Sequence, residues 1–212
     1  MATPHSGVRA PQQQRSRESL ERVLRAAEKL LAKRGYEGFT IAELSRDARL
    51  SVGSVYGRFE SKDALIYAIH ARMLHRMTED YAKHHPALAG VDIEGVVSRG
   101  VHRLADPMNG ERALLRVFML RAPIDRRIAD RASKESRAIS RQFTAAVLEH
   151  RSDIQHPVPE RAADVAFRLA YDVLARRIMY GPRFESELTI PWDDLVDEVI
   201  RAVIAYLCFE RR

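Results

Sequence analysis

Apolar residues recur at steps of three and four along almost the whole chain, from Leu20 to Leu207. This spacing is typical of helices that bury one face, and no segment shows the alternation of period two that marks a half-buried strand. Breaks that contain proline or glycine divide the pattern into about nine helical stretches. The sequence therefore predicts an all-α fold.

Length and composition narrow the class of protein further. The 212 residues are 46% apolar, which is enough for the core of one large or two modest domains. No apolar run approaches the ~20 residues of a membrane span, and the first residues lack the apolar stretch of a signal peptide. The single cysteine excludes an internal disulfide and fits a reducing compartment. We expect a cytoplasmic protein with no membrane partner.

The segment from Thr40 to Lys62 carries two helix-start signals around a tight turn. Thr40 and Glu43 form a capping-box pattern, so a helix is expected to begin at Ile41 and to stop near Arg49. Ser51 is placed to cap a second short helix, from Val52 to about Phe59. Ser61 is placed to cap a third. The segment therefore predicts a helix-turn-helix followed by another helix.

The outward positions of the second short helix are small or hydrogen-bonding, as a helix in a DNA major groove requires. Lys62 is expected beside backbone N–H groups that favour an anion. The alternative is that the pair is an ordinary helical hairpin in a larger bundle. The candidate DNA-binding residues are Thr40, Ser51, Val52, Ser54, Tyr56, Gly57, Arg58 and Lys62.

Residues 17–75 resemble the DNA-binding domain of TetR-type (tetracycline-repressor-like) transcriptional regulators. The resemblance rests on residues 23–31, Gly35, Phe39-Thr40, Ile41-Ala42-Glu43-Leu44, 51–56, Arg58-Phe59 and 61–65. It implies that Thr40, Tyr56 and Lys62 contact DNA phosphates. The chain departs from the family pattern at Arg49, where a glycine is frequent, and at Gly57-Arg58, where an aromatic residue and a histidine are frequent. We expect Arg58 to make phosphate or guanine contacts in their place.

The positive charge is concentrated at the proposed DNA-binding end. Residues 1–62 hold 12 Lys and Arg against 7 Asp and Glu, a net of +5, whereas residues 63–212 have a net of +1. This agrees with a footprint on a phosphate backbone, although a solvated basic surface is the alternative. We predict a disordered basic tail at 1–15, a helix-turn-helix domain at 16–62, and a helical ligand-binding and dimerisation domain at 63–212. Tail arginines could reach DNA or simply be mobile.

The later helices are expected at 92–106, 111–121, 124–151, 158–180 and 192–210. The last two are predicted to form a homodimer, because the final helix has a wide apolar stripe and the preceding one aligns Ala162, Ala166 and Ala170. Such a dimer would place two reading helices about 34 Å apart on a near-palindrome. The alternative is that both stripes face the protomer's own core.

A small-molecule effector is implied by the family resemblance, and the middle helices offer apolar residues for its pocket. The candidate ligand-binding residues are His102, Met108, Phe118, Arg121, Phe143 and Tyr171. Ordinary core packing is the alternative for each of them. The effector's arrival is expected to tilt the fourth helix and spread the two DNA readers.

Catalytic signals are weak. The sequence has no glycine-rich phosphate loop, no zinc-type cysteine pairs and no nucleophile elbow, so we expect neither an enzyme nor a cofactor or metal site. The predicted function is a dimeric, ligand-responsive repressor that binds double-stranded DNA. Two alternatives remain: a ligand-independent DNA-organising or activating protein of the same fold, and an all-helical small-molecule-binding protein or enzyme that does not bind DNA.

Overall fold

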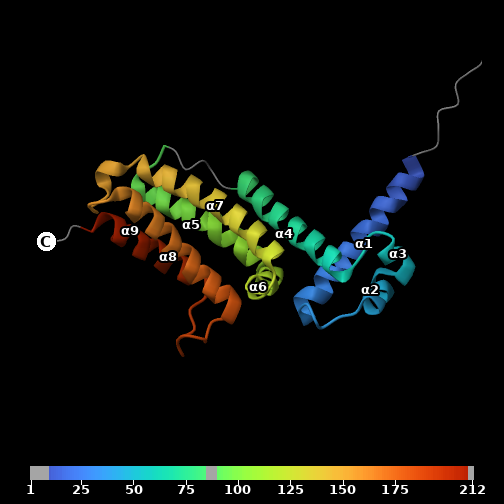
Figure 1. Cartoon of the computed structure of the whole chain (residues 1–212). Coiled ribbons are helices and arrows are strands. Elements are labelled where there is room, and N and C mark those ends of the chain that lie inside the picture. The colour runs from blue at the N-terminus through green and yellow to red at the C-terminus, as the bar shows by residue number, and fades with distance from the viewer. Residues whose placement is uncertain (1–9, 85–89, 210–212) are drawn as a thin grey trace, which may run out of the picture. The chain divides into compact units, whose positions relative to one another are not determined.

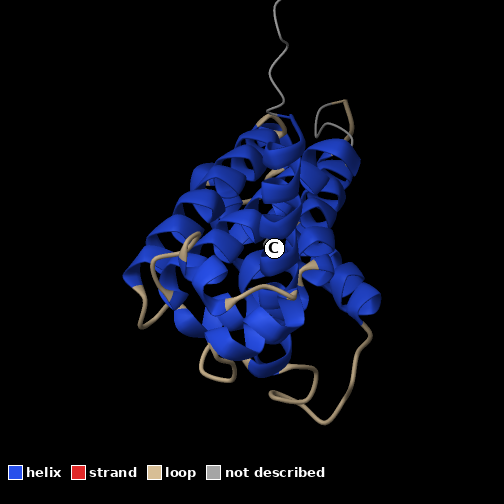
Figure 2. Cartoon of the chain, turned by 90° about the vertical axis from the view of Figure 1, so that its right-hand side faces the viewer, coloured by secondary structure: helices blue, strands red, loops and turns tan. Residues whose placement is uncertain are grey.

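The computed structural model of the chain describes residues 10–84 and 90–209 (Figure 1). Within them are nine α-helices, one short 3₁₀ turn and no strand, which confirms the predicted all-α class (Figure 2). The helices are α1 (Ala10–Arg34), α2 (Ile41–Ala48), α3 (Val52–Tyr56), α4 (Lys62–His84), α5 (Ile93–Gly110), α6 (Arg112–Arg121), α7 (Arg126–Leu148), α8 (Pro159–Tyr180) and α9 (Trp192–Cys208). The chain divides into two compact units between Ala71 and Arg72, inside α4, whereas the predicted domain boundary lies at the start of that helix.

The first unit holds α1, α2, α3 and the beginning of α4. The apolar stripe of α1 is buried, as are the inward positions of the short helices and the first turns of α4. The fully or nearly fully buried residues include Val23, Ala27, Leu31, Phe39, Leu44, Ala48, Val55, Leu65 and Ile69. Because α2 packs on α1 and α3 packs on α2, this core fixes the two short helices against the long one.

The connection from α1 to α2 depends on two glycines. Gly35 ends α1 in the left-handed region at φ +72° and donates its N–H to the carbonyl of Leu31 at 2.8 Å. Gly38 approaches the end of α1 so closely that a Cβ there would lie 2.1 Å from the Arg34 carbonyl oxygen. The chain can therefore turn directly into Thr40 and α2.

The N-terminal segment differs from its prediction. Residues 1–9 lie outside the described residues, and α1 begins at Ala10, so residues 10–15 of the expected tail are helical. The run from Gln12 to Arg17 contains neither proline nor glycine, and Gln14 donates a hydrogen bond to Glu18 one turn later at 3.2 Å. Two of the tail arginines, Arg15 and Arg17, are exposed on this helix.

The second unit is a helical bundle. Within it α8 packs against α5, α6, α7 and α9, and α5 also packs against α7 and α9 (Figure 1). Gly100 allows the close approach of α5 and α7, because a Cβ at this position would lie 2.5 Å from Cδ2 of Phe143. The packing of the bundle core thus depends both on its apolar side chains and on the lack of a side chain at Gly100.

Two helix ends in this unit differ from their predictions. The expected break at Pro107 is absent, and α5 continues to Gly110 because Pro107 lies in the last turn and its carbonyl still accepts the N–H of Glu111 at 3.1 Å. α7 ends at Leu148, and a separate 3₁₀ turn, Arg151–Asp153, follows. Over the described ranges, no helix is both long enough and apolar enough to cross a membrane.

Candidate nucleic-acid interface

The predicted capping box at the start of α2 is present. The Thr40 hydroxyl accepts the N–H of Glu43 at 3.2 Å, and the Glu43 carboxylate accepts the N–H of Thr40 at 2.9 Å. This backbone hydrogen bond, followed by the Arg34 guanidinium 2.9 Å away, lowers the pKa of the Glu43 carboxyl below its usual value. These bonds fix the first turn of α2, where the Thr40 side chain is exposed.

The turn between the short helices is left-handed at Arg49. This residue ends α2 with φ 54° and ψ 50°, and its N–H bonds back to the carbonyl of Arg46 at 3.1 Å. It is the only non-glycine residue with positive φ among the described residues. A glycine, which is frequent here in the family pattern, would adopt this conformation without the crowding that the Cβ of arginine causes. Arg49 therefore makes the turn less favourable than a glycine would.

The second short helix, α3, is held at its N-terminus by Ser51. The Ser51 hydroxyl accepts the N–H of Ser54 at 3.1 Å, and the two hydroxyl oxygens lie 2.8 Å apart. The side chains of Val52 and Tyr56 are 40% and 50% exposed, whereas Val55 is buried. This five-residue helix therefore presents an outward face anchored by a buried valine.

The helix α3 is shorter than predicted, because it ends at Tyr56 rather than near Phe59. Gly57 caps it, and the N–H groups of Arg58 and Phe59 both bond to the carbonyl of Val55 at 3.0 Å. Glycine disfavours helix propagation, so the chain leaves the helix there while keeping its carbonyls satisfied.

The Arg58 guanidinium is bonded to α1. It donates one hydrogen bond to the Ser16 hydroxyl at 3.3 Å and another to the hydroxyl of Ser19, which is buried. These two serines were not among the predicted site residues, because their pairing with Arg58 spans about forty positions of sequence. The structure thus places Arg58 as a tie between the end of α3 and α1.

Lys62 lies at the first position of α4, in a cradle of backbone and aromatic groups. Its ammonium donates to the carbonyl of Phe39 at 2.8 Å and sits 4.7 Å and 4.5 Å from the ring centroids of Tyr36 and Phe39. Ser61 caps the helix by accepting the N–H of Ala64 at 3.1 Å. The hydrogen bond and the two ring contacts therefore fix the position of the ammonium.

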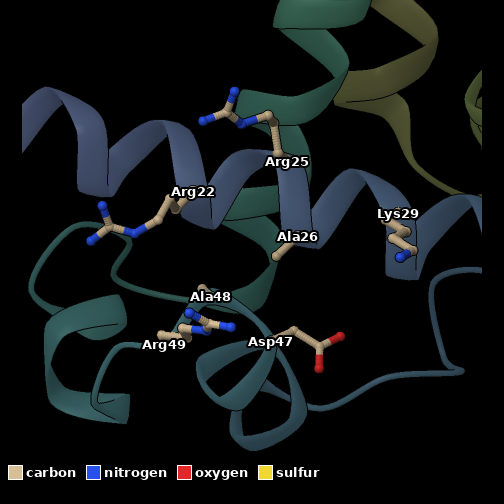
Figure 3. A pocket seen from close by; sticks show the side chains of 7 residues that line it. All are labelled: Arg22, Arg25, Ala26, Lys29, Asp47, Ala48 and Arg49. Atoms are coloured by element: carbon tan, nitrogen blue, oxygen red, sulfur yellow. The ribbon is translucent and has the colours of Figure 1, made fainter.

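A groove between α1 and the end of α2 escaped the sequence analysis. Arg22, Arg25, Ala26, Lys29, Asp47, Ala48 and Arg49 line its volume of about 580 Å³ (Figure 3). The spacing of the three α1 cations at i, i+3 and i+7 was a readable signal, since these positions share one helix face. The α2 residues that line the groove could not be predicted from the sequence, because their place beside α1 depends on tertiary packing.

Two of the predicted ligand-binding residues, Phe143 and Tyr171, are connected in the second unit through a third ring, that of Phe167. The ring of Phe143 on α7 lies 5.9 Å from that of Phe167 on α8, and Phe167 lies 5.9 Å from Tyr171. Burial, followed by the nearby Asp172 carboxylate, raises the pKa of the Tyr171 hydroxyl. These three rings form an aromatic row, and its two ends, Phe143 and Tyr171, are residues predicted from the sequence.

The other four candidates are dispersed through the second unit. Met108 and Phe118 are buried core residues. His102 is half-exposed, with Nδ1 3.7 Å from an Asp106 carboxylate oxygen. Arg121 lies with Nε 3.4 Å from Oδ2 of Asp125, the residue that caps α7. A role in effector binding stays a prediction for all six residues.

The alanines expected to admit a partner helix face inward. Ala162, Ala166 and Ala170 are at most 2% exposed within the single chain, so they allow close packing inside the protomer instead. The exposed aliphatic residues in the middle of α8 are Leu169 at 43% and Val173 at 40%, and Tyr180 at its end is 44% exposed. Leu169 and Val173 lie one turn apart, on a face of α8 different from the face that carries the three alanines.

Comparisons with known proteins agree with this architecture. Residues 23–69 match the family described as bacterial regulatory proteins, tetR family. No curated protein shows significant sequence similarity to the chain. Among solved structures, a tetR-family bacterial regulatory protein from Rhodococcus RHA1 superposes with a TM-score of 0.68 at 18% identity, covering 89% of this chain and 96% of the other.

Two further structures show the same fold. A transcriptional regulator from Rhodococcus sp. RHA1 has a TM-score of 0.67 at 19% identity, covering 88% of this chain and 94% of its own. The TetR family transcriptional regulator PfmR from Thermus thermophilus has a TM-score of 0.63 at 16% identity, covering 90% and 100%. Residues 23–69 are therefore similar to the tetR family of bacterial regulatory proteins, and the chain has the fold of these solved transcriptional regulators.

Proposed function

We propose that this protein is a sequence-specific, DNA-binding transcriptional regulator whose reading element is α3. The observation that carries the proposal is the exposed face of this capped helix, on which Val52, Ser54 and Tyr56 project while Val55 anchors it to the core. Small side chains allow a helix to lie close to base edges in the major groove. Ser51 and Arg58 hold the two ends of α3, so its position is set before DNA arrives.

Phosphate contacts are assigned to Thr40, Tyr56 and Lys62. Thr40 and Lys62 lie at the first turns of α2 and α4, where backbone N–H groups and the helix dipole favour an anion. Tyr56 is exposed at the end of α3 and carries a hydroxyl donor. In this proposal Arg58 is a positioning residue, because its guanidinium is bonded to α1.

The proposed active species is a homodimer through α8 and α9 that binds a near-palindromic operator. Leu169 and Val173 are its anchors on α8, because large apolar side chains with this exposure are suited to burial against a second copy. On α9, Leu195 and Ile204 are half-buried at opposite edges of the buried stripe, so either edge is available for a partner helix. Leu169→Asp is expected to convert the dimer into monomers in analytical ultracentrifugation, whereas Leu120→Asp, on another exposed leucine at 42%, should not.

A small-molecule effector is proposed to bind beside the aromatic row of Phe143, Phe167 and Tyr171 and to relieve repression. Such rings offer apolar contact, and the hydroxyl of the half-buried Tyr171 can orient a polar group. The effector must bind the DNA-released conformation more tightly than the DNA-bound one, since equal affinity shifts nothing. Because its target is chromosomal DNA, we place the protein in the cytoplasm.

The experiment that tests the function is a fluorescence-anisotropy titration of DNA from upstream of the protein's own reading frame. We expect binding that is stronger than to a shuffled duplex, weakens steeply with salt, and falls about tenfold or more in Tyr56→Phe and Lys62→Ala together. Arg201→Ala, in an exposed ion pair on α9, serves as the control of charge. Equal affinity for the shuffled duplex would contradict the proposal.

Release of this complex by an extract of small metabolites separates a ligand-responsive repressor from a ligand-independent DNA-organising protein. After dialysis has removed the metabolites, the released protein should bind the same DNA again, since effector binding is reversible. Persistent binding in every extract would favour the ligand-independent alternative.

A further inference from the structure

The groove between α1 and α2 has a strong and unbalanced positive charge. Four cations line it, Arg22, Arg25, Lys29 and Arg49, against one carboxylate, Asp47, which leaves a net of three positive charges. The three α1 side chains and Arg49 are all exposed. The groove is lined between its charged groups by the small residues Ala26 and Ala48, which face each other across the two helices, whereas the Arg25 side chain points away from α2 (Figure 3).

None of these cations is neutralised within the part of the chain that the structure describes. Arg22, Arg25, Lys29 and Arg49 have no carboxylate within 4.0 Å there, and Asp47, although it lines the same groove, pairs with none of them. Figure 3 shows the Asp47 carboxylate directed away from the Arg49 guanidinium. Elsewhere cations do find partners, as in Arg34 with Glu43 and Arg168 with Asp164.

Arg49 adds a second observation. It keeps a long cationic side chain at φ 54°, a conformation that costs a non-glycine residue about 1 kcal/mol. A glycine would remove this cost and also remove a cation from the groove rim. A local conformational cost at an exposed, charged position is typical of a residue whose role lies in binding.

From this arrangement we propose that the groove binds the phosphate backbone of DNA that flanks the sequence read by α3. Clustered cations around a hollow focus positive potential and favour a polyanion. Arg49 stands two residues before Ser51, the cap of α3, so a bound duplex brings phosphates toward this end of the groove. The proposal rests on the proposed DNA-binding function and adds a sequence-independent contact to it.

Flanking contacts have a measurable signature. Each phosphate neutralised by a cation contributes about 0.9 to the slope of log affinity against log salt concentration. The α1 cations should therefore contribute a slope of about two to three, and only when the duplex extends beyond the sequence that α3 reads. They should leave the preference among base sequences unchanged.

The test uses the full-length protein and a duplex that it enriches from a random DNA library. This duplex is prepared in its shortest form that keeps the sequence preference and in a form extended by about 10 bp of random sequence at each end. The triple variant Arg22→Gln, Arg25→Gln, Lys29→Gln is compared with Lys134→Gln, Arg137→Gln, Arg141→Gln. The control removes the same charge at the same spacing from exposed positions of α7.

On the extended duplex, we expect the groove variant to lose a slope of about two to three and about tenfold in affinity, while the control keeps the wild-type slope. On the short duplex the groove variant should match the wild type. Equal slopes for both variants on the extended duplex would overturn the proposal. Equal losses on the two duplexes would also overturn it, because the groove would then act within the footprint of α3 or on the fold.

Arg49→Gly provides a variant that we expect to be more stable than the wild type, since it removes the cost of the left-handed turn. It should lose a slope of about one on the extended duplex while its unfolding temperature rises. An unchanged slope in Arg49→Gly would remove Arg49 from the proposed contact. A wild-type protein with no sequence preference would instead contradict the proposed function, and the flanking contact would fall with it.

Discussion

Arg76 on α4 and Glu111 at the junction of α5 and α6 are joined by two hydrogen bonds, from Nε at 2.6 Å and from Nη2 at 3.0 Å. The two side chains are 31% and 20% exposed, so water screens the pair only in part. Paired donors on a planar guanidinium hold a carboxylate in a defined orientation. This ion pair ties the part of α4 beyond the unit boundary to the bundle.

Glu111→Gln is therefore expected to lower the free energy of unfolding by about 1–2 kcal/mol, since it weakens a partly buried, charge-assisted pair. Urea denaturation measures the change. Glu198→Gln is the matched control, because its ion pair with Arg201 is 59% and 70% exposed and should contribute within about 0.5 kcal/mol. A loss of the same size in both variants would mean that the Arg76 pair has no special role.

Arg49→Gly should raise the free energy of unfolding by about 0.5–1 kcal/mol, because glycine adopts φ 54° without the steric cost that arginine has. Arg46→Gly, three residues earlier in the helical part of α2, should lower it by a similar amount. Thermal unfolding of the two variants gives the comparison. Destabilisation by both substitutions would show that the Arg49 side chain contributes contacts that outweigh its conformation.

Gly100→Ala should destabilise the second unit by about 1–3 kcal/mol, because the new Cβ would lie 2.5 Å from the Phe143 ring. Gly110→Ala, in the last turn of the same helix, meets no atom within 4 Å and should be neutral or slightly stabilising. Adding Phe143→Leu to Gly100→Ala should cost less than the sum of the single changes. Additive losses in chemical denaturation would exclude a clash with this ring.

The capping box predicts an acid-sensitive contribution to stability. The folded state lowers the pKa of Glu43 below its ordinary value of 4.5, so its contribution is fully present above that pH and is lost as the pH falls through the folded-state pKa. Acidification should therefore destabilise the wild type more than Glu43→Gln. Glu37→Gln, at an exposed position of the same unit, should follow the wild-type curve of unfolding temperature against pH. Parallel curves for all three proteins would contradict this assignment.

The sequence predicted the local features of this fold well, because they depend on neighbouring residues. The capping box at Thr40 and the cap at Ser51 follow from side-chain oxygens three residues before the N–H groups they accept. Pro107 misled the prediction, since a proline in a final helical turn removes a single backbone bond and its neighbours keep theirs.

The parts of the candidate site that were not predictable are tertiary. Arg58 carries a charge suited to DNA, and only the fold reveals that Ser16 and Ser19 receive its donors. The alanine stripe of α8 has the same pattern whether it faces a partner or the protomer, and the neighbouring helices decide the matter. The groove depends on the packing of α1 on α2, which sequence spacing alone does not specify.

The most direct test of the central claim is selection of binding sites from a random DNA library by the wild type, Ser54→Ala and Lys62→Ala. If α3 reads bases, the wild type should enrich one near-palindromic sequence, and Ser54→Ala should change the preferred bases at a few positions. Lys62→Ala should enrich the same sequence with lower affinity, since phosphate contacts carry no sequence information. Enrichment of no sequence by the wild type, or the same base preference in the wild type and in Ser54→Ala, would contradict the reading of bases by α3.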